Sequence, residues 1–127
     1  MEWTALVTIA ALIEYGVFSL LVAGARARTG VKAPAITGHP EFERYFRVQQ
    51  NTLERLIIFI PSLWIYSFYN GQKVAVILGL VFILARAAYC AVYVRAPARR
   101  SLIFGVGEVA NTALMVGAVI GAVRSML

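Results

Sequence analysis

Residues 43–64 read ERYFRVQQNTLERLIIFIPSLW, a polar stretch that runs directly into an apolar one. Four polar side chains of this stretch follow one another at steps of three, four and three: Arg44, Arg47, Asn51 and Glu54. Residues at these steps share one stripe of an α-helix. An ionisable side chain costs roughly 2.5–3.5 kcal/mol at the centre of a bilayer. The stripe must therefore face protein, water or a ligand.

The composition predicts a single all-α membrane domain covering residues 1–127. The chain has 127 residues, of which 61% are hydrophobic and only 14% are charged, and its mean hydropathy is +0.77. A soluble domain of this size could not bury so much apolar surface. The net charge of +6 does not indicate a nucleic-acid partner, because the basic residues flank apolar runs and form no solvated face. We expect an integral membrane protein.

Four apolar runs predict a bundle of four transmembrane helices, at about residues 4–24, 41–69, 74–94 and 101–123. At about 1.5 Å per residue, each run is long enough to cross a hydrocarbon core of about 30 Å. Glycine and proline residues separate the runs, and the Asn70-Gly71 pair is typical of a helix end. Pro61 is expected to bend the second helix, and Gly117 and Gly121 to allow close packing of the fourth.

The loops carry unequal numbers of basic residues. The first and third loops hold six of them: Arg26, Arg28, Lys32, Arg95, Arg99 and Arg100. The second loop holds only Lys73. Because Lys and Arg gather in cytoplasmic loops, the first and third loops should be cytoplasmic, together with the polar start of the second helix. We expect a multi-pass protein of a bacterial inner membrane or the endoplasmic reticulum, with its site on the cytoplasmic face.

The basic residues of the two loops and the polar start of the second helix are thus expected at the same membrane face. Many arginines together with one or two acidic residues favour a small anionic ligand that also carries an amine. Arginine binds carboxylates through two parallel hydrogen bonds, and a glutamate can accept from an ammonium group. On the third helix, Arg86, Tyr89 and Tyr93 share one face, and on the fourth Glu108 and Asn111 lie one turn apart. The alternative is that these groups neutralise one another and bind lipid head groups, and the spacing leaves both open. With one histidine and no aspartate, no metal site is expected.

Two runs of this sequence are similar to a known family. The run Glu43-Arg44-x-x-Arg47-x-Gln49-x-Asn51-x-x-Glu54 resembles the signature of the MAPEG family, membrane-associated proteins in eicosanoid and glutathione metabolism. The run Ala85-Arg86-x-x-Tyr89-x-x-x-Tyr93, followed by Arg100, is similar to its microsomal glutathione transferase and leukotriene C synthase branch. The resemblance implies a homotrimer that binds glutathione, its co-substrate, between adjacent subunits near the cytoplasmic face.

The resemblance also implies roles for single residues. Glutathione would be bound by seven of them: Arg26, Arg47, Gln49, Asn51, Glu54, Tyr89 and Tyr93. Arg100 would be the catalytic residue, because a cation stabilises the thiolate of a thiol whose pKa is about 8.5. Three arginines would support the site: Arg44, Arg86 and Arg99. Either Arg99 or Arg100 could face the thiol.

Three classes of function remain to be compared. In the first, glutathione attacks a lipophilic electrophile that arrives through the bilayer, or reduces a lipid hydroperoxide. In the second, the chain is a non-catalytic lipid-binding protein like the lipoxygenase-activating protein of the same family; the presence of Arg100 and the whole polar stripe favours the enzyme. In the third, it is a transporter or channel subunit, whose polar groups would spread across the bilayer, whereas here they crowd toward one end.

Overall fold

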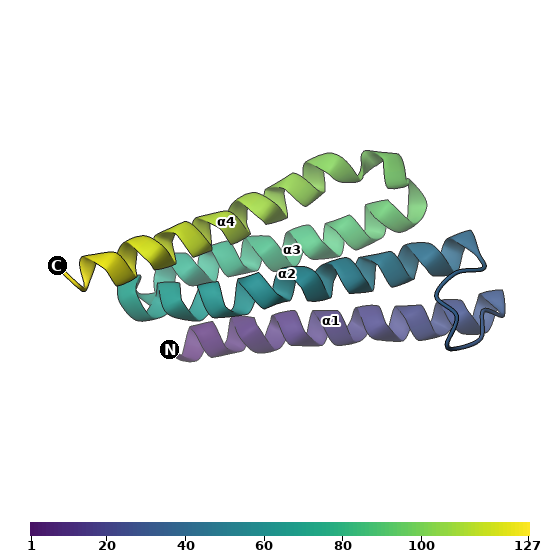
Figure 1. Ribbon diagram of the computed structural model, residues 1–127, viewed down its shortest axis with the longest axis horizontal. Helices are drawn as coiled ribbons and strands as arrows, with labels where there is room; N and C mark the ends of the chain where they lie inside the picture. The colour runs from purple at the N-terminus through teal and green to yellow at the C-terminus, as the bar shows by residue number, and fades with distance from the viewer.

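The computed structural model contains four long helices and one turn of 3₁₀ helix. α1 spans Glu2–Thr29, α2 Pro40–Asn70, α3 Gln72–Arg95, η1 Pro97–Arg99 and α4 Arg100–Arg124. The structure describes residues 1–99 and 101–127, and no strand occurs among them. The helices lie side by side along the long axis, with both termini at one end and the α1–α2 loop and η1 at the other (Figure 1). The predicted all-helical bundle is confirmed.

The helices end at the glycine and proline residues that separate the apolar runs. α1 ends at Gly30, which adopts a left-handed φ of 74° and donates its N–H to the carbonyl of Arg26. α2 begins at Pro40, where Nδ1 of the preceding His39 accepts from the backbone N–H of Glu41 at 3.2 Å. α1 continues to Thr29, beyond the apolar run, because nothing before Gly30 disfavours a helix. α2 continues through Pro61.

Within residues 1–99 and 101–127, three helical segments are long and apolar enough to cross a membrane: α1, α3 and Ser101–Arg124 of α4. α2 has 31 residues, but its first half carries the polar stretch. On the outside of the bundle Leu20, Leu84 and Val109 are 73%, 68% and 70% exposed, as expected of helices that face lipid or a partner helix in a membrane. Length and composition therefore support three of the four predicted spans.

Apolar side chains and glycines pack closely in the half of the bundle that holds the two termini. Phe59 of α2 stacks on Phe82 of α3 with ring centroids 4.1 Å apart. At Gly117 of α4 a Cβ atom would collide with the ring of Tyr66, and the Gly117 carbonyl accepts from the Asn70 side chain at 2.9 Å. A Cβ at Gly121 would likewise be too close to Asn70. The two glycines thus hold α4 close to the second half of α2.

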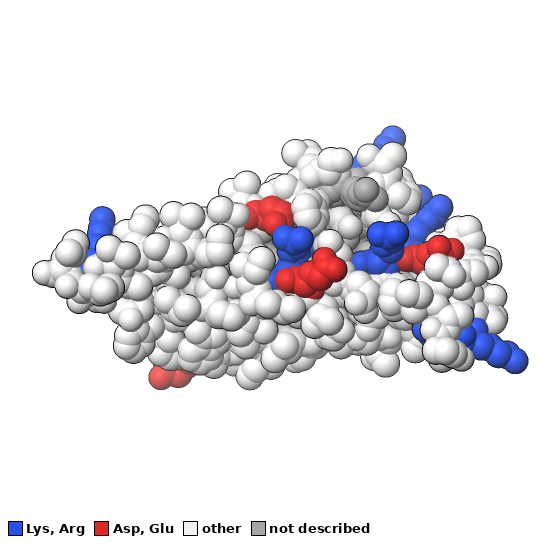
Figure 2. Space-filling model, viewed as in Figure 1, with Lys and Arg blue, Asp and Glu red and all other residues white. Residues whose placement is uncertain are grey.

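Toward the opposite end α4 leans away from α2 (Figure 1). Figure 2 shows acidic and basic side chains next to one another along the middle of this face, with most of the visible Lys and Arg atoms toward the end that holds the α1–α2 loop and η1. The two basic loops therefore lie at the same end of the bundle.

Candidate functional site

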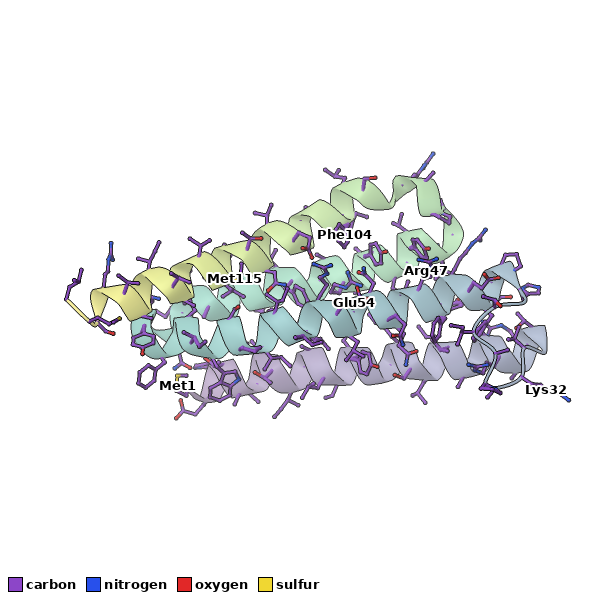
Figure 3. The ribbon with its side chains drawn as sticks, viewed as in Figure 1. Met1, Lys32, Arg47, Glu54, Phe104 and Met115 are labelled. Atoms are coloured by element: carbon purple, nitrogen blue, oxygen red, sulfur yellow. The ribbon has the colours of Figure 1, made fainter. Side chains whose placement is uncertain are left out.

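A cavity of about 490 Å³ lies between α2, α3 and α4. α2 contributes Arg47, Gln50, Asn51 and Glu54, α3 contributes Tyr89 and Tyr93, and α4 contributes Ser101 and Phe104. Figure 3 shows the labelled side chains of Arg47, Glu54 and Phe104 around the space between α2 and α4. The volume falls within the range of about 300–1,000 Å³ that is usual for small-molecule sites.

Five residues of the predicted site line this cavity: Arg47, Asn51, Glu54, Tyr89 and Tyr93. The helical spacing explains why, since residues 47, 51 and 54 follow one face of α2 and residues 89 and 93 are one turn apart on α3. Three of the four stripe residues, Arg47, Asn51 and Glu54, therefore face a cavity that is open enough to leave Arg47 and Glu54 exposed.

Arg86 lies beneath the cavity and is only 2% exposed. Its Nη1 donates to Oδ1 of Asn51 at 3.0 Å, and its Nη2 donates to Oγ1 of Thr52 at 2.7 Å. Its guanidinium also lies 4.5 Å from the centroid of the Tyr89 ring. Because arginine can only donate, Asn51 must turn its oxygen toward Arg86, and its amide N–H groups are then the donors left for a ligand. Arg86 thus contacts two residues that line the cavity, Asn51 and Tyr89, without lining it itself.

Aromatic rings form one wall of the cavity. Tyr89 and Tyr93 are buried and stack with centroids 5.5 Å apart. Phe104 of α4 packs on Tyr89 with centroids 5.8 Å apart. Phe18, Val48 and Cys90 belong to the same buried cluster as the two tyrosines. This packing gives the cavity a rigid apolar side opposite its charged residues.

Opposite charges stand at two points along α2. Arg47 and Glu54 are both exposed and lie seven residues apart, which corresponds to about 10 Å along the helix axis. Asn51 lies between them. A cation, an amide donor and a carboxylate in this order suit a small molecule with a carboxylate at one point and an ammonium group at another.

Three residues of the predicted site make contacts away from the cavity. Gln49 donates from Nε2 to Oγ of Ser19 on α1 at 2.8 Å. Arg26 donates from Nη1 to the carbonyl of Ala35 at 2.7 Å and lies over the Phe42 ring, so it braces the α1–α2 loop. Arg44 donates from Nη1 to the carbonyl of Val94 at 3.2 Å and ties α2 to the end of α3. Their role in ligand binding stays a prediction.

The catalytic role, which the sequence assigned to Arg100 or its neighbour Arg99, stays a prediction. Arg99 is exposed in η1. The prediction for Arg100 falls on a side chain outside the described residues. Among residues 1–99 and 101–127 no group of three or more His, Cys, Asp or Glu side chains could hold a metal ion.

Sequence reasoning missed three residues that line the cavity: Gln50, Ser101 and Phe104. Gln50 lies three residues after Arg47 and four before Glu54, so helical spacing could have found it. Ser101 and Phe104 precede Glu108 at helical spacing, so they share the face of α4 that the polar pair of Glu108 and Asn111 marks. The signal was present in the spacing, although these residues carry no charge.

Comparison with known proteins identifies the family. The pattern of the MAPEG family matches residues 4–120, almost the whole chain. The chain belongs to the MAPEG family. This confirms the resemblance that the signature on α2 predicted. Together with the three long apolar helices, MAPEG membership indicates an integral membrane protein.

The MAPEG relatives of this chain include proteins with and without a described activity. An uncharacterized protein of Synechocystis sp. is 42% identical over 118 residues, which cover 93% of this chain and 86% of that protein. Microsomal glutathione S-transferase 2 of Mus musculus is 37% identical over 123 residues, 97% of this chain and 84% of that protein. Leukotriene C4 synthase of Bos taurus is 36% identical over 94 residues, 74% of this chain and 63% of that protein.

Proposed function

We propose that this chain is a membrane-bound glutathione transferase that joins glutathione to lipophilic electrophiles. The observation that carries the proposal is the cavity in which Arg47, Asn51 and Glu54 follow one another along α2. Glutathione has a carboxylate at each end, an ammonium group beside one of them and a thiol between them. The names of the relatives, which include a microsomal glutathione S-transferase, support the same ligand.

The cavity residues suit the polar ends of glutathione. Arg47 would bind one carboxylate through two hydrogen bonds. Glu54, about 10 Å further along α2, would accept hydrogen bonds from the ammonium group. Asn51, whose oxygen is held by Arg86, would donate to a carboxylate or peptide carbonyl. The rings of Tyr89 and Tyr93 would form the wall against which the peptide lies.

A homotrimer in which all four helices cross the membrane would complete this site. The polar half of α2 needs protein around it at membrane depth, because exposed charges are costly there. Gln49 and Arg26 contact α1 and the α1–α2 loop and do not line the cavity of their own chain, so in this proposal they would contact glutathione bound in the cavity of an adjacent subunit. The basic loops at the same end support a cytoplasmic position of the site.

The chemistry requires a thiolate and an electrophile from the membrane. Arg100 would stabilise the thiolate of glutathione as its proton leaves to water, since an adjacent cation lowers the pKa of a thiol. The sulfur would then form a bond to an electrophilic carbon; with an epoxide, the C–O bond breaks and the alkoxide takes a proton. With a lipid hydroperoxide, two glutathione molecules would give a disulfide, an alcohol and water.

An apolar groove favours a second candidate function. It has a volume of about 480 Å³ and lies between α3 and α4, with Leu78, Val81, Leu102 and Val106 among its residues. It shares Ser101 with the polar cavity. In a transferase this groove would lead an electrophile to the cavity. In a non-catalytic lipid-binding protein, like the lipoxygenase-activating protein of the family, it would hold lipid alone.

Conjugation of glutathione to a generic electrophile by the purified protein in detergent distinguishes the two functions. We expect turnover in the parent and in Lys73→Ala, a control at the opposite end of the bundle. Arg100→Ala should lose most of the activity and Arg99→Ala little. Activity that survives Arg100→Ala but not Arg99→Ala would move the catalytic role to Arg99. A parent protein without turnover or thiolate absorbance would contradict the transferase.

A further inference from the structure

α4 is joined to α2 by two different kinds of contact. In its second half, Gly117 and Gly121 pack closely on Tyr66 and Asn70. Nearer the cavity, Nη1 of Arg55 on α2 meets Oε2 of Glu108 on α4 at 3.1 Å. One turn beyond this ion pair, toward the start of α4, Phe104 lines the cavity. The ion pair therefore stands between the tightly packed half of α4 and the half that leans away from α2 (Figure 1).

The ion pair also supports a wall of the cavity. The guanidinium of Arg55 lies 5.8 Å from the centroid of the Phe104 ring, and Tyr89 packs on the same ring at 5.8 Å. The attraction between a guanidinium and an aromatic face favours this placement of the ring. Phe104 is thus in contact with α2 and with α3, and Arg55 supplies the contact with α2.

The surroundings of the pair make it costly to lose one partner. The side chains of Arg55 and Glu108 are only 26% and 30% exposed. Nε of Arg55 is buried and has no hydrogen-bond partner among the described residues, so the hydrogen bond to Glu108 is important for keeping the guanidinium in place. Neither residue lines the cavity. Loss of the ion pair would therefore affect the reaction indirectly, by moving the Phe104 ring and by changing the distance between α2 and α4.

We propose that Arg55 and Glu108 are a positioning pair that fixes the first half of α4 against α2 and holds Phe104 as a wall of the cavity. The expected effect on kcat/KM rests on the proposed transferase function. The expected effect on the position of α4 rests on the geometry alone. Because neither side chain lines the cavity, the pair would act on the reaction without contacting glutathione or the electrophile. It sets the shape of the space in which they meet.

The test compares four variants with the parent: Arg55→Met, Glu108→Gln, the two substitutions together, and the exchange of Arg55→Glu with Glu108→Arg. A matched control is Arg28→Met, because Arg28 forms an ion pair of 2.9 Å with Glu41 between α1 and α2 and does not line the cavity. Two measurements are made on each protein. One is kcat and KM for glutathione and for a neutral electrophile, and the other is amide hydrogen exchange of residues 101–107 without any ligand.

We expect each single substitution to lower kcat/KM about tenfold, which is less than the roughly hundredfold cost that a misplacement of about 1 Å at a reacting centre can have. The double substitution should cost no more than either single one, because both break the same contact. Amide exchange in residues 101–107 should become several-fold faster, while exchange in residues 109–121 stays as in the parent. The exchanged pair should recover slow exchange but not full kcat, because the guanidinium then lies on α4 and no longer reaches Phe104 from α2.

Kinetics within twofold of the parent together with unchanged exchange in residues 101–107 would overturn the proposal, and so would equal effects in Arg28→Met. Where Arg55→Met fails to fold, Glu108→Gln decides, because it keeps the shape of the side chain and removes the negative charge that pairs with Arg55. A parent that does not bind glutathione refutes the proposed function instead. The exchange of residues 101–107 then still decides whether the pair fixes α4.

Discussion

The substitution Arg86→Met removes the guanidinium beneath the cavity and keeps a side chain of similar length. Arg86 donates to Asn51 and Thr52 at 3.0 and 2.7 Å and lies against the Tyr89 ring. Hydrogen bonds from a charged donor contribute about 1.5–3 kcal/mol each, so the two together amount to roughly 3–6 kcal/mol. The contact with the aromatic ring adds about 0.5–2 kcal/mol.

Two features of the structure reduce the net loss of stability. A guanidinium that is 2% exposed has lost its hydration, which costs several kcal/mol, and methionine recovers this cost. The partners also keep other contacts, since Oγ1 of Thr52 donates to the carbonyl of Val48 at 2.7 Å and Asn51 lines the cavity, where water can reach it. We therefore expect the free energy of unfolding to fall by only about 1–2 kcal/mol. The affinity for glutathione should fall about tenfold, or about 1.4 kcal/mol, because Asn51 loses its orientation.

The assay combines denaturant unfolding of the protein in detergent with calorimetric titration of glutathione. Arg86→Lys is the informative comparison, because an ammonium group cannot reach Asn51 and Thr52 with the planar fork of arginine; it should bind glutathione with intermediate affinity. Arg124→Met, at the end of α4, should change neither quantity. A protein that loses more than about 4 kcal/mol, the size of a broken buried ion pair, would refute the reasoning on stability. Unchanged affinity would show that Arg86 does not orient Asn51 for the ligand.

Three further predictions concern packing, ligand binding and assembly. Gly117→Ala should lower the free energy of unfolding in urea by about 1–3 kcal/mol, because the new Cβ would collide with Tyr66. Gly16→Ala is the control, since nothing lies within 4 Å of a Cβ there, and its free energy of unfolding should be unchanged or higher. Glu54→Gln should raise KM for glutathione about tenfold, since hydrogen bonds to a charged group are worth about 1.5–3 kcal/mol. Its stability should change little, because Glu54 is exposed. If the variant and the parent have equal KM values, Glu54 does not bind the ammonium group. Native mass measurement in detergent should give three subunits, and a monomer that is fully active would contradict the shared site.

The helices could be predicted within a few residues because turn-forming residues stand between them. Gly30, Pro40 and Gly71 end or begin helices in the structure, as the sequence indicated. α1 extends beyond the span predicted at about residues 4–24, because an apolar run marks the part of a helix inside the bilayer and not its ends. α2 is not among the three helices whose length and composition suit a membrane span, because its first half is polar.

The polar stripe on α2 was predicted correctly as one face of a helix, and its members nevertheless differ in their contacts. Arg47, Asn51 and Glu54 line the cavity, whereas Arg44, one turn earlier, has turned to the end of α3. Gln49 lies two residues after Arg47, so it points away from the stripe and meets Ser19. Arg86 was predicted only as a supporting residue; its hydrogen bonds to Asn51 and Thr52 could not be predicted, because they depend on the distance between α2 and α3.

Equilibrium binding of glutathione to the purified protein tests the central claim most directly. The parent should release or absorb heat in a saturable titration, and Arg47→Ala should weaken binding at least tenfold, because a carboxylate of glutathione would lose its cation. Lys73→Ala, at the opposite end of the bundle, should bind as the parent does. A parent that does not bind glutathione, or an Arg47→Ala variant with the affinity of the parent, would show that this cavity is not the glutathione site.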